Sequence, residues 1–200
     1  MKNATLNSLI AVAVAWSTTL IVSSASAGLA QEQIQRLENG QVVVSVAVAV
    51  NGEGAHVEAA IDVPMSAQTI WPIMTDCDRA PSYVPKLISC RILERAPNGD
   101  WDIREHLSSP GWLLPNFRTV FRSDYEINRR VHFSRVAGDL RKSEGEWLLF
   151  PIDEGRATRV IYTVDTEYRS WIPNAWMHDY LADEISNILN ALRHECLKSK

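Results

Sequence analysis

Alternating hydrophobic and polar positions run through most of this chain. Residues 55–63 (AHVEAAIDV) place an apolar side chain at every second position, which is the period of a half-buried β-strand. A β-branched run over 41–50 ends at the turn signal Asn51-Gly52 and predicts a preceding strand. Turn residues separate six further predicted strands, at 87–95, 100–107, 117–127, 131–137, 144–151 and 157–168. The spacing predicts one large antiparallel sheet.

The hydrophobic period changes from two to 3.6 near the C-terminus. From Trp176 to Cys196, apolar residues recur at helical spacing and predict a long amphipathic helix. Ser66 is a suitable N-cap for a shorter helix, which Pro72 should keep short or bent. Residues 76–85 are predicted to form a loop or a second short helix. This order of elements predicts an α+β fold in which the long helix lies across the apolar face of the sheet.

The N-terminus has the pattern of a secretory signal peptide. An apolar stretch follows Lys2, and Ala25-Ser26-Ala27 is typical of a cleavage site. The alternative is an uncleaved membrane anchor, but the apolar stretch is shorter than the roughly 20 residues that a span requires. We therefore expect residues 1–27 to be removed and the product to be periplasmic or secreted.

Composition sets limits on the remainder of the chain. The 200 residues, of which 46% are hydrophobic, are typical of one globular domain and exclude wholesale disorder. We expect an N-terminal extension with an added strand over 28–54 and the main domain over 55–197. The formal net charge of −4 disfavours nucleic acid as a partner, because binding phosphates requires an excess of Lys and Arg.

Three cysteines remain after export, namely Cys77, Cys90 and Cys196. An oxidising compartment favours one disulfide and one free thiol, whereas three buried thiols are the alternative. Spacing does not select a pair. The chain has no Cys-x-x-Cys motif and no common hydrolase, metalloprotease or nucleotide-binding motif. We therefore expect no catalytic residue, no metal and no cofactor.

Five segments in this order resemble the START-like helix-grip (SRPBCC) superfamily, which includes polyketide cyclases and coenzyme-Q-binding proteins. The resemblance implies a curved antiparallel sheet of about six to seven strands around the C-terminal helix, with two short helices after the first strand. It also implies a cavity for a hydrophobic molecule between sheet and helix. The segments are IDVPMS (61–66) with IW (70–71) and MTD (74–76), PSYVP (81–85) with CRILER (90–95), GDL (138–140), EGEWLLFP (144–151) and TRVIY (158–162).

Apolarity assigns the strand positions that should face this cavity. Without the resemblance, a solid aromatic core would be the preferred interpretation. Glu105 and Arg135 share strand phase with large apolar residues, so they are candidates for a polar anchor or an acid–base pair. The alternative places both charges at the rim of the sheet. The expected cavity residues are Trp101, Ile103, Phe117, Phe121, Tyr125, Phe133, Trp147, Val160, Tyr162, Tyr180, Leu181 and Ile188.

Apolar residues in two proline-containing segments suggest a gate. Trp112 and Leu113 lie between two prolines, and Trp171 precedes the long helix. These side chains would either open the cavity and touch a membrane, or cap one end of the core.

Two functions of different classes fit the sequence. The first, which we favour, is an exported, non-enzymatic carrier of a lipid, sterol, quinone or similar molecule, with transient contact to a membrane or a membrane protein. The second is a cyclase or dehydratase that acts on an aromatic or polyketide substrate, which would need two convergent titratable groups in the cavity. A protein-interaction module with a filled core is a third interpretation.

Overall fold

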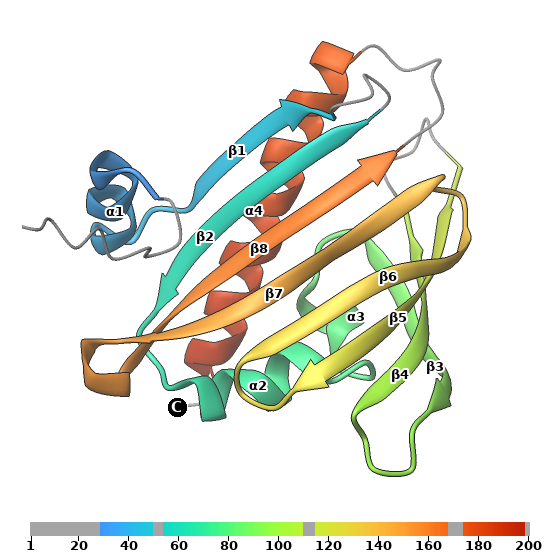
Figure 1. Ribbon diagram of the computed structural model, residues 1–200, viewed down its shortest axis with the longest axis horizontal. Helices are drawn as coiled ribbons and strands as arrows, with labels where there is room; N and C mark the ends of the chain where they lie inside the picture. Colours follow the sequence, from blue (N-terminus) through green and yellow to red (C-terminus); the bar gives the residue numbers. More distant parts are fainter. Residues whose placement is uncertain (1–28, 50–53, 110–114, 168–173, 199–200) are drawn as a thin grey trace, which may run out of the picture.

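A computed structural model describes residues 29–49, 54–109, 115–167 and 174–198 (Figure 1). Its helices and strands follow the predicted order closely. They are α1 (Gln31–Glu38), β1 (Val43–Val48), β2 (Ala55–Val63), α2 (Ala67–Thr75), α3 (Ala80–Tyr83), β3 (Leu87–Arg95), β4 (Trp101–Ser108), β5 (Phe117–Glu126), β6 (Arg130–Gly138), β7 (Lys142–Ile152), the 3₁₀ turn η1 (Asp153–Gly155), β8 (Ala157–Glu167) and α4 (Asn174–Lys198).

The strands form one open antiparallel sheet in the order β1-β2-β8-β7-β6-β5-β4-β3. From β3 to β8, each strand pairs with its neighbour along the chain. The pairing of β2 with β8 brings Ile61 opposite Val160 and joins the two ends of the fold. The expected α+β helix-grip architecture is confirmed, with eight strands instead of six to seven. The N-terminal extension supplies one edge of the sheet, because β1 pairs with β2 over its whole length.

The main core lies between the sheet and α4, which crosses one face of the sheet (Figure 1). Ile61 and Val160 from the sheet and Leu189 from α4 are fully buried in it. The two strand residues belong to the predicted two-residue period, and Leu189 belongs to the predicted 3.6-residue period of the helix. The short helix α1 covers the opposite face, where Leu37 packs against Val43 and Ala60.

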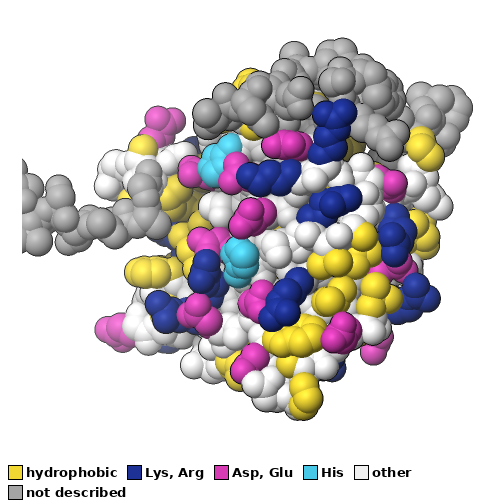
Figure 2. All heavy atoms as spheres, turned by 45° about the vertical axis from the view of Figure 1, so that its right-hand side comes forward, with side chains coloured by type: hydrophobic (Ala, Val, Ile, Leu, Met, Phe, Trp, Pro, Cys, Tyr) yellow, Lys and Arg dark blue, Asp and Glu magenta, His cyan; other side chains and the backbone are white. Residues whose placement is uncertain are grey.

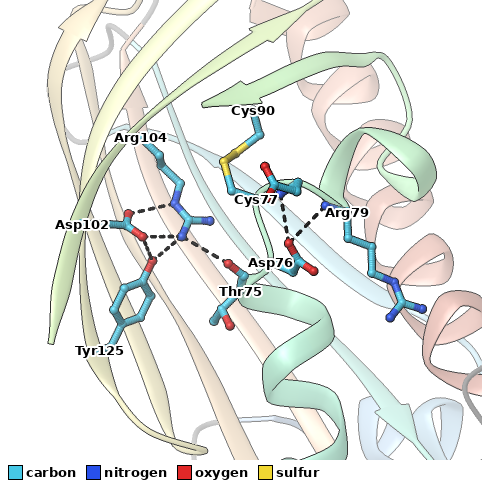
Figure 3. Close-up of a disulfide and its surroundings, with 9 residues drawn as sticks. Thr75, Asp76, Cys77, Arg79, Cys90, Asp102, Arg104 and Tyr125 are labelled. Atoms are coloured by element: carbon cyan, nitrogen blue, oxygen red, sulfur yellow. Dashed lines mark hydrogen bonds and ion pairs between the residues drawn. A yellow bond between two sulfur atoms is a disulfide. The ribbon is translucent and has the colours of Figure 1, made fainter. Parts of the chain in front are cut away.

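A disulfide ties the short-helix layer to the edge of the sheet. Cys77 follows α2, and its partner Cys90 lies on the edge strand β3, with 5.3 Å between the Cα atoms (Figure 3). Cys196 on α4 is a buried free thiol. The structure therefore has one disulfide and one free cysteine, the first of the two arrangements that the cysteine count left open.

The face of the sheet that turns away from α4 carries many charged side chains, together with a group of hydrophobic ones (Figure 2). Arg159 on β8 donates from Nε to Oδ1 of Asp62 on β2 at 2.8 Å, and these two residues are directly opposite in the register. Acidic and basic side chains are interspersed over much of this face in Figure 2, as expected for a solvated surface with favourable cross-strand pairs. The described helices include none that is both long enough and apolar enough to cross a membrane.

Candidate ligand-binding cavity

The structure contains a cavity of about 270 Å³ between the sheet and α4. Strands β4 to β8 form its wall on one side, and α2, α3 and α4 contribute the other side. The space exists because the long helix packs closely against β1 and β2 but not against the β4–β6 part of the sheet. The cavity therefore occupies the position where the helix-grip resemblance predicts one.

Aromatic rings form a continuous chain of contacts along the cavity. The ring of Phe121 on β5 meets that of Phe133 on β6 edge to face, with centroids 6.0 Å apart. Phe133 stacks on Tyr162 of β8 at 6.0 Å, and Tyr162 contacts Trp147 of β7 at 4.4 Å. Together with Ile188 of α4, these rings give the cavity a mainly apolar wall. We call Phe121, Phe133, Trp147 and Tyr162 the aromatic wall.

A buried ion pair on β4 lies beside the aromatic wall, since Arg104 is the register partner of Phe121 on β5. Nε of Arg104 donates to Oδ1 of Asp102 at 2.9 Å, and Nη2 donates to Oδ2 at 2.6 Å. The side chains of Asp102 and Arg104 are only 1% and 8% exposed. Nη2 also donates to the carbonyl oxygen of Thr75, at the end of α2, at 3.3 Å (Figure 3). The pair thus connects the sheet to the helical layer.

Tyr125 on β5 completes this cluster. Its hydroxyl donates to Oδ2 of Asp102 at 2.8 Å and accepts a hydrogen bond from Nη2 of Arg104. Burial opposes the charge on Arg104, but the hydrogen bonds and charge of Asp102 outweigh it and raise the pKa of the guanidinium. Burial also raises the pKa of the Tyr125 hydroxyl, which therefore stays protonated. The cluster of Asp102, Arg104 and Tyr125 carries no net charge.

His106 lies two residues farther along the same face of β4 and also lines the cavity. Its ring meets that of Phe121 edge to face, with 4.8 Å between centroids. Its Nε2 atom is buried and has no hydrogen-bond partner among the described residues. Burial, assisted by the positive charge of Arg104, lowers the pKa of His106 to about 4, so the imidazole is neutral at pH 7. We call Arg104, His106, Ser123 and Tyr125 the polar wall.

A second, more open hollow of about 320 Å³ lies beyond the ion pair. Arg104, Tyr125 and Thr75 line both spaces, so the cluster stands between them. Trp71, Arg95 and the β3–β4 turn form the remaining sides of this hollow.

Seven of the residues expected to face a ligand do line the cavity. Phe117 shares their strand phase but lies at the start of β5, outside the lining set. Val160 is fully buried in the core, and Tyr180 and Leu181 pack against that core from α4. The seven are Phe121, Tyr125, Phe133, Arg135, Trp147, Tyr162 and Ile188.

The predicted phase of β4 is wrong. Trp101 and Ile103 face outward, and the Trp101 ring lies beneath Arg122, with 4.3 Å from the guanidinium carbon to the ring centroid. Glu105 also faces outward, where Arg118 and Arg91 pair with its carboxylate. The hydrogen bond from Arg118, together with the charges of both arginines, lowers the pKa of Glu105. Glu105 is therefore part of the surface ion-pair network and does not anchor a ligand.

Arg135 lines the cavity but is exposed, and its Nη2 donates to the carbonyl oxygen of Gly138 at 3.0 Å. It belongs to the edge of the cavity, as the alternative interpretation of a rim charge expected. The suggested gate residues Trp112, Leu113 and Trp171 lie outside the described residues.

Sequence reasoning missed Asp102, Arg104 and His106, the polar residues that do face inward. A signal was present, since Asp102 and Arg104 are two positions apart with opposite charge on one strand face. The attraction within such a pair can offset the free-energy cost of burying both charges when additional hydrogen bonds occupy their remaining donors and acceptors. Within the described ranges, we find no group of three or more His, Cys, Asp or Glu side chains that could hold a metal ion.

The sheet, the gripped helix and the cavity define a START-like helix-grip protein. Residues 63–193 match the family described as polyketide cyclase / dehydrase and lipid transport. The chain belongs to this family.

The individual proteins that resemble this chain share less than a third of its residues over the aligned regions. The persistence and stress-resistance toxin PasT of Escherichia coli O6:H1 is 28% identical over 106 residues, which are 53% of this chain and 64% of the relative. A STAR-related lipid transfer protein from Xanthomonas axonopodis has a TM-score of 0.66 at 17% identity, covering 78% of this chain and 93% of that one. The ZhuI aromatase/cyclase from Streptomyces sp. R1128 has a TM-score of 0.61 at 18% identity, covering 72% of this chain and 93% of that one. These structural similarities establish the fold.

Proposed function

We propose that this protein is an exported carrier that holds one hydrophobic small molecule between the sheet and α4. The cavity and its aromatic wall are the observation that carries the proposal. Transfer of a ligand from water to such a wall gains about 0.8 kcal/mol for each buried CH₂ group. Binding therefore needs no chemistry beyond burial and a few hydrogen bonds.

The size of the cavity limits the ligand. Pockets for drug-sized molecules are typically about 300–1,000 Å³, and this cavity of about 270 Å³ lies just below that range. A compact ring system or one acyl chain fits this space better than a two-chain phospholipid. The lipid transfer relative from Xanthomonas supports a lipid-like ligand, and the Streptomyces aromatase/cyclase supports a compact aromatic one.

The disulfide supports export. Structural disulfides persist in the periplasm and outside the cell but are rare in the cytosol, where thiols are kept reduced. The Cys77–Cys90 bond fits the N-terminal signal-peptide pattern of residues 1–27. N-terminal sequencing of the protein from its native cell tests this point, and a chain that begins after Ala27 in the periplasmic or culture fraction is expected. Recovery of full-length protein from the cytosol would contradict export.

An enzymatic role is the second candidate, because the cavity contains titratable groups. A cyclase-type reaction needs a general base whose pKa is near the working pH. His106, with a pKa of about 4, is a weak base, and the Arg104 guanidinium is engaged by Asp102. The polar wall is therefore better suited to binding a ligand than to moving protons.

Native mass spectrometry of protein purified gently from its own compartment tests the carrier. A stoichiometric apolar ligand that solvent extraction releases is expected. Ile188→Trp should fill the cavity and abolish binding, whereas Val136→Trp, at a position 50% exposed on β6, should not. Empty protein that also fails to bind a fluorescent apolar probe would rule out the carrier.

A further inference from the structure

The buried Nε2 atom of His106 is an unusual feature of the cavity. Buried polar atoms in folded proteins nearly always have a hydrogen-bond partner, and an exception calls for a ligand, a water or another explanation. His106 lines the cavity, and the described residues provide no partner for Nε2. The burial that lowers its pKa also keeps the ring neutral, with one donor and one acceptor nitrogen.

The neighbouring charges are already satisfied. Arg104 uses Nε and Nη2 to bind both carboxylate oxygens of Asp102, and Nη2 also reaches Thr75 and Tyr125. A second anion at this position would place two negative charges against the one guanidinium of Arg104. Bringing an unpaired charge into such a site costs far more than a neutral polar group does. Burial also raises the pKa of Tyr162, so this hydroxyl on the aromatic wall is neutral as well.

We propose that His106 selects an uncharged ligand, namely an apolar ring or chain that carries a carbonyl or hydroxyl group hydrogen-bonded to the imidazole. The inference rests on the proposed carrier function and narrows its ligand class. Ketones, quinones, phenols and alcohols satisfy this description. Fatty acids and phosphate-bearing lipids do not, because their head groups would be charged beside the closed ion pair.

Among the described residues, Arg135 is the one cavity-lining cation outside this cluster, and it leads to a different expectation for charged lipids. Its side chain is exposed and already donates to Gly138. An anionic head group held there would leave an acyl tail to fill the cavity against Arg104 and His106. The tail offers no hydrogen bond, so the His106 ring would stay unsatisfied. The polar wall therefore favours a ligand whose neutral polar group enters the cavity.

Three probes of one shape test this selectivity. Acetylnaphthalene, isopropylnaphthalene and naphthoate, substituted at the same ring position, offer a ketone, a hydrocarbon and a carboxylate. Affinities are measured by calorimetry at neutral pH with the disulfide-bonded mature protein. The ketone should bind roughly tenfold more tightly than the hydrocarbon, as expected for one added hydrogen bond. The carboxylate should bind at least about 100-fold more weakly than the ketone.

Two substitutions of His106 separate recognition from folding. His106→Leu should bring the ketone to the affinity of the hydrocarbon while leaving hydrocarbon binding nearly unchanged. His106→Gln, which retains a donor and an acceptor, should keep part of the preference for the ketone over the hydrocarbon. This variant provides the test if the leucine variant does not fold. His132→Leu on the outward phase of β6 is the matched control and should bind all three probes like the parent protein.

The outcomes distinguish the inference from the function on which it rests. Equal affinities for ketone and hydrocarbon in the parent protein, or tighter binding of naphthoate, would overturn the selectivity but leave a hydrophobic carrier. Retention of the ketone preference in both His106 variants would also overturn it. Failure of all three probes, together with an empty purified protein, would remove the carrier function and this inference with it.

Discussion

The imidazole of His106 and the phenyl ring of Phe121 meet edge to face, with centroids 4.8 Å apart and planes 85° apart. At this contact the polar wall joins the aromatic wall. His106 belongs to β4 and Phe121 to β5, and adjacent strands in register bring the two rings to the same face of the sheet. The cavity thus presents hydrogen-bonding groups to a ligand directly beside apolar rings.

Two ion pairs with the same spacing allow a direct test of burial. Asp102 and Arg104 are two positions apart on the inner face of β4, and Arg122 and Asp124 are two positions apart on the outer face of β5. Asp102→Ala should lower the free energy of unfolding by about 3–5 kcal/mol, because it leaves a buried guanidinium without its anion. Asp124→Ala should have a much smaller effect, because both partners in that pair contact water. Urea unfolding of the two variants measures the difference, and equal costs would contradict the buried role of the β4 pair.

Stability should fall in acid because of His106. Its pKa is about 4 in the folded protein and 6.5 in an unstructured peptide, so between these values the unfolded chain binds the proton and the folded chain does not. The folded state therefore loses roughly 3 kcal/mol of stability as the pH falls from 6.5 to 4. His106→Leu should flatten this part of the pH dependence, as measured by urea unfolding at several pH values.

His56 provides a control of opposite sign. Its hydrogen bond to Asp165, aided by Glu58, raises its pKa against the opposing effect of burial. The folded protein therefore holds this proton more tightly, which stabilises it below pH 6.5, and the benefit is lost as the pH rises through the raised pKa. His56→Gln should thus steepen the loss of stability in acid. Similar pH profiles for the two histidine variants would contradict these assignments.

Reduction of the disulfide should weaken the fold. The Cys77–Cys90 bond closes a loop with a sequence separation of 13, for which the lost chain entropy corresponds to about 3 kcal/mol. Dithiothreitol should lower the melting temperature of the parent protein but not that of a variant in which both cysteines are alanine. Thiol titration of the denatured, unreduced protein should find one free thiol, that of Cys196. Three thiols before reduction would contradict the bond.

Gly145 on β7 leaves room for the aromatic wall. A methyl group at this position would overlap the carbonyl oxygen of Thr163 and lie 2.9 Å from Cζ of Phe133. Gly145→Ala should therefore cost about 1–3 kcal/mol and displace the Phe133 ring toward the cavity. Thermal unfolding measures the loss of stability. The affinity for a fluorescent apolar probe measures the effect of the displaced ring on the cavity. Ser143→Ala on the same strand phase, where a Cβ atom is already present, is the control for thermal unfolding, and an equal loss of stability in the two variants would refute the steric argument.

The hydrophobic periodicity predicted the helices and strands well, because an element that buries one face needs apolar side chains at the period of its own backbone geometry. It also gave the correct inward phase for β5 through Phe121 and for β7 through Trp147. Strand β4 differs because both of its phases carry large side chains. The apolar phase, which includes Trp101, turns outward, since Trp101 is covered by Arg122 while Asp102 and Arg104 neutralise each other inside. Residue-by-residue apolarity does not detect a compensated ion pair, nor the neutral state of a buried histidine.

The order of strands has a consequence for how the chain acquires its shape. From β3 to β8, sheet neighbours are also neighbours in sequence, so these strands can pair one after another through short turns. The pairing of Ile61 with Val160 must instead close a loop of about a hundred residues, which carries a large entropic cost. The core around α4 includes both of these strands. A nascent chain leaving the ribosome or a membrane channel can therefore assemble the hairpins early, but it encloses the cavity only when its last quarter has emerged.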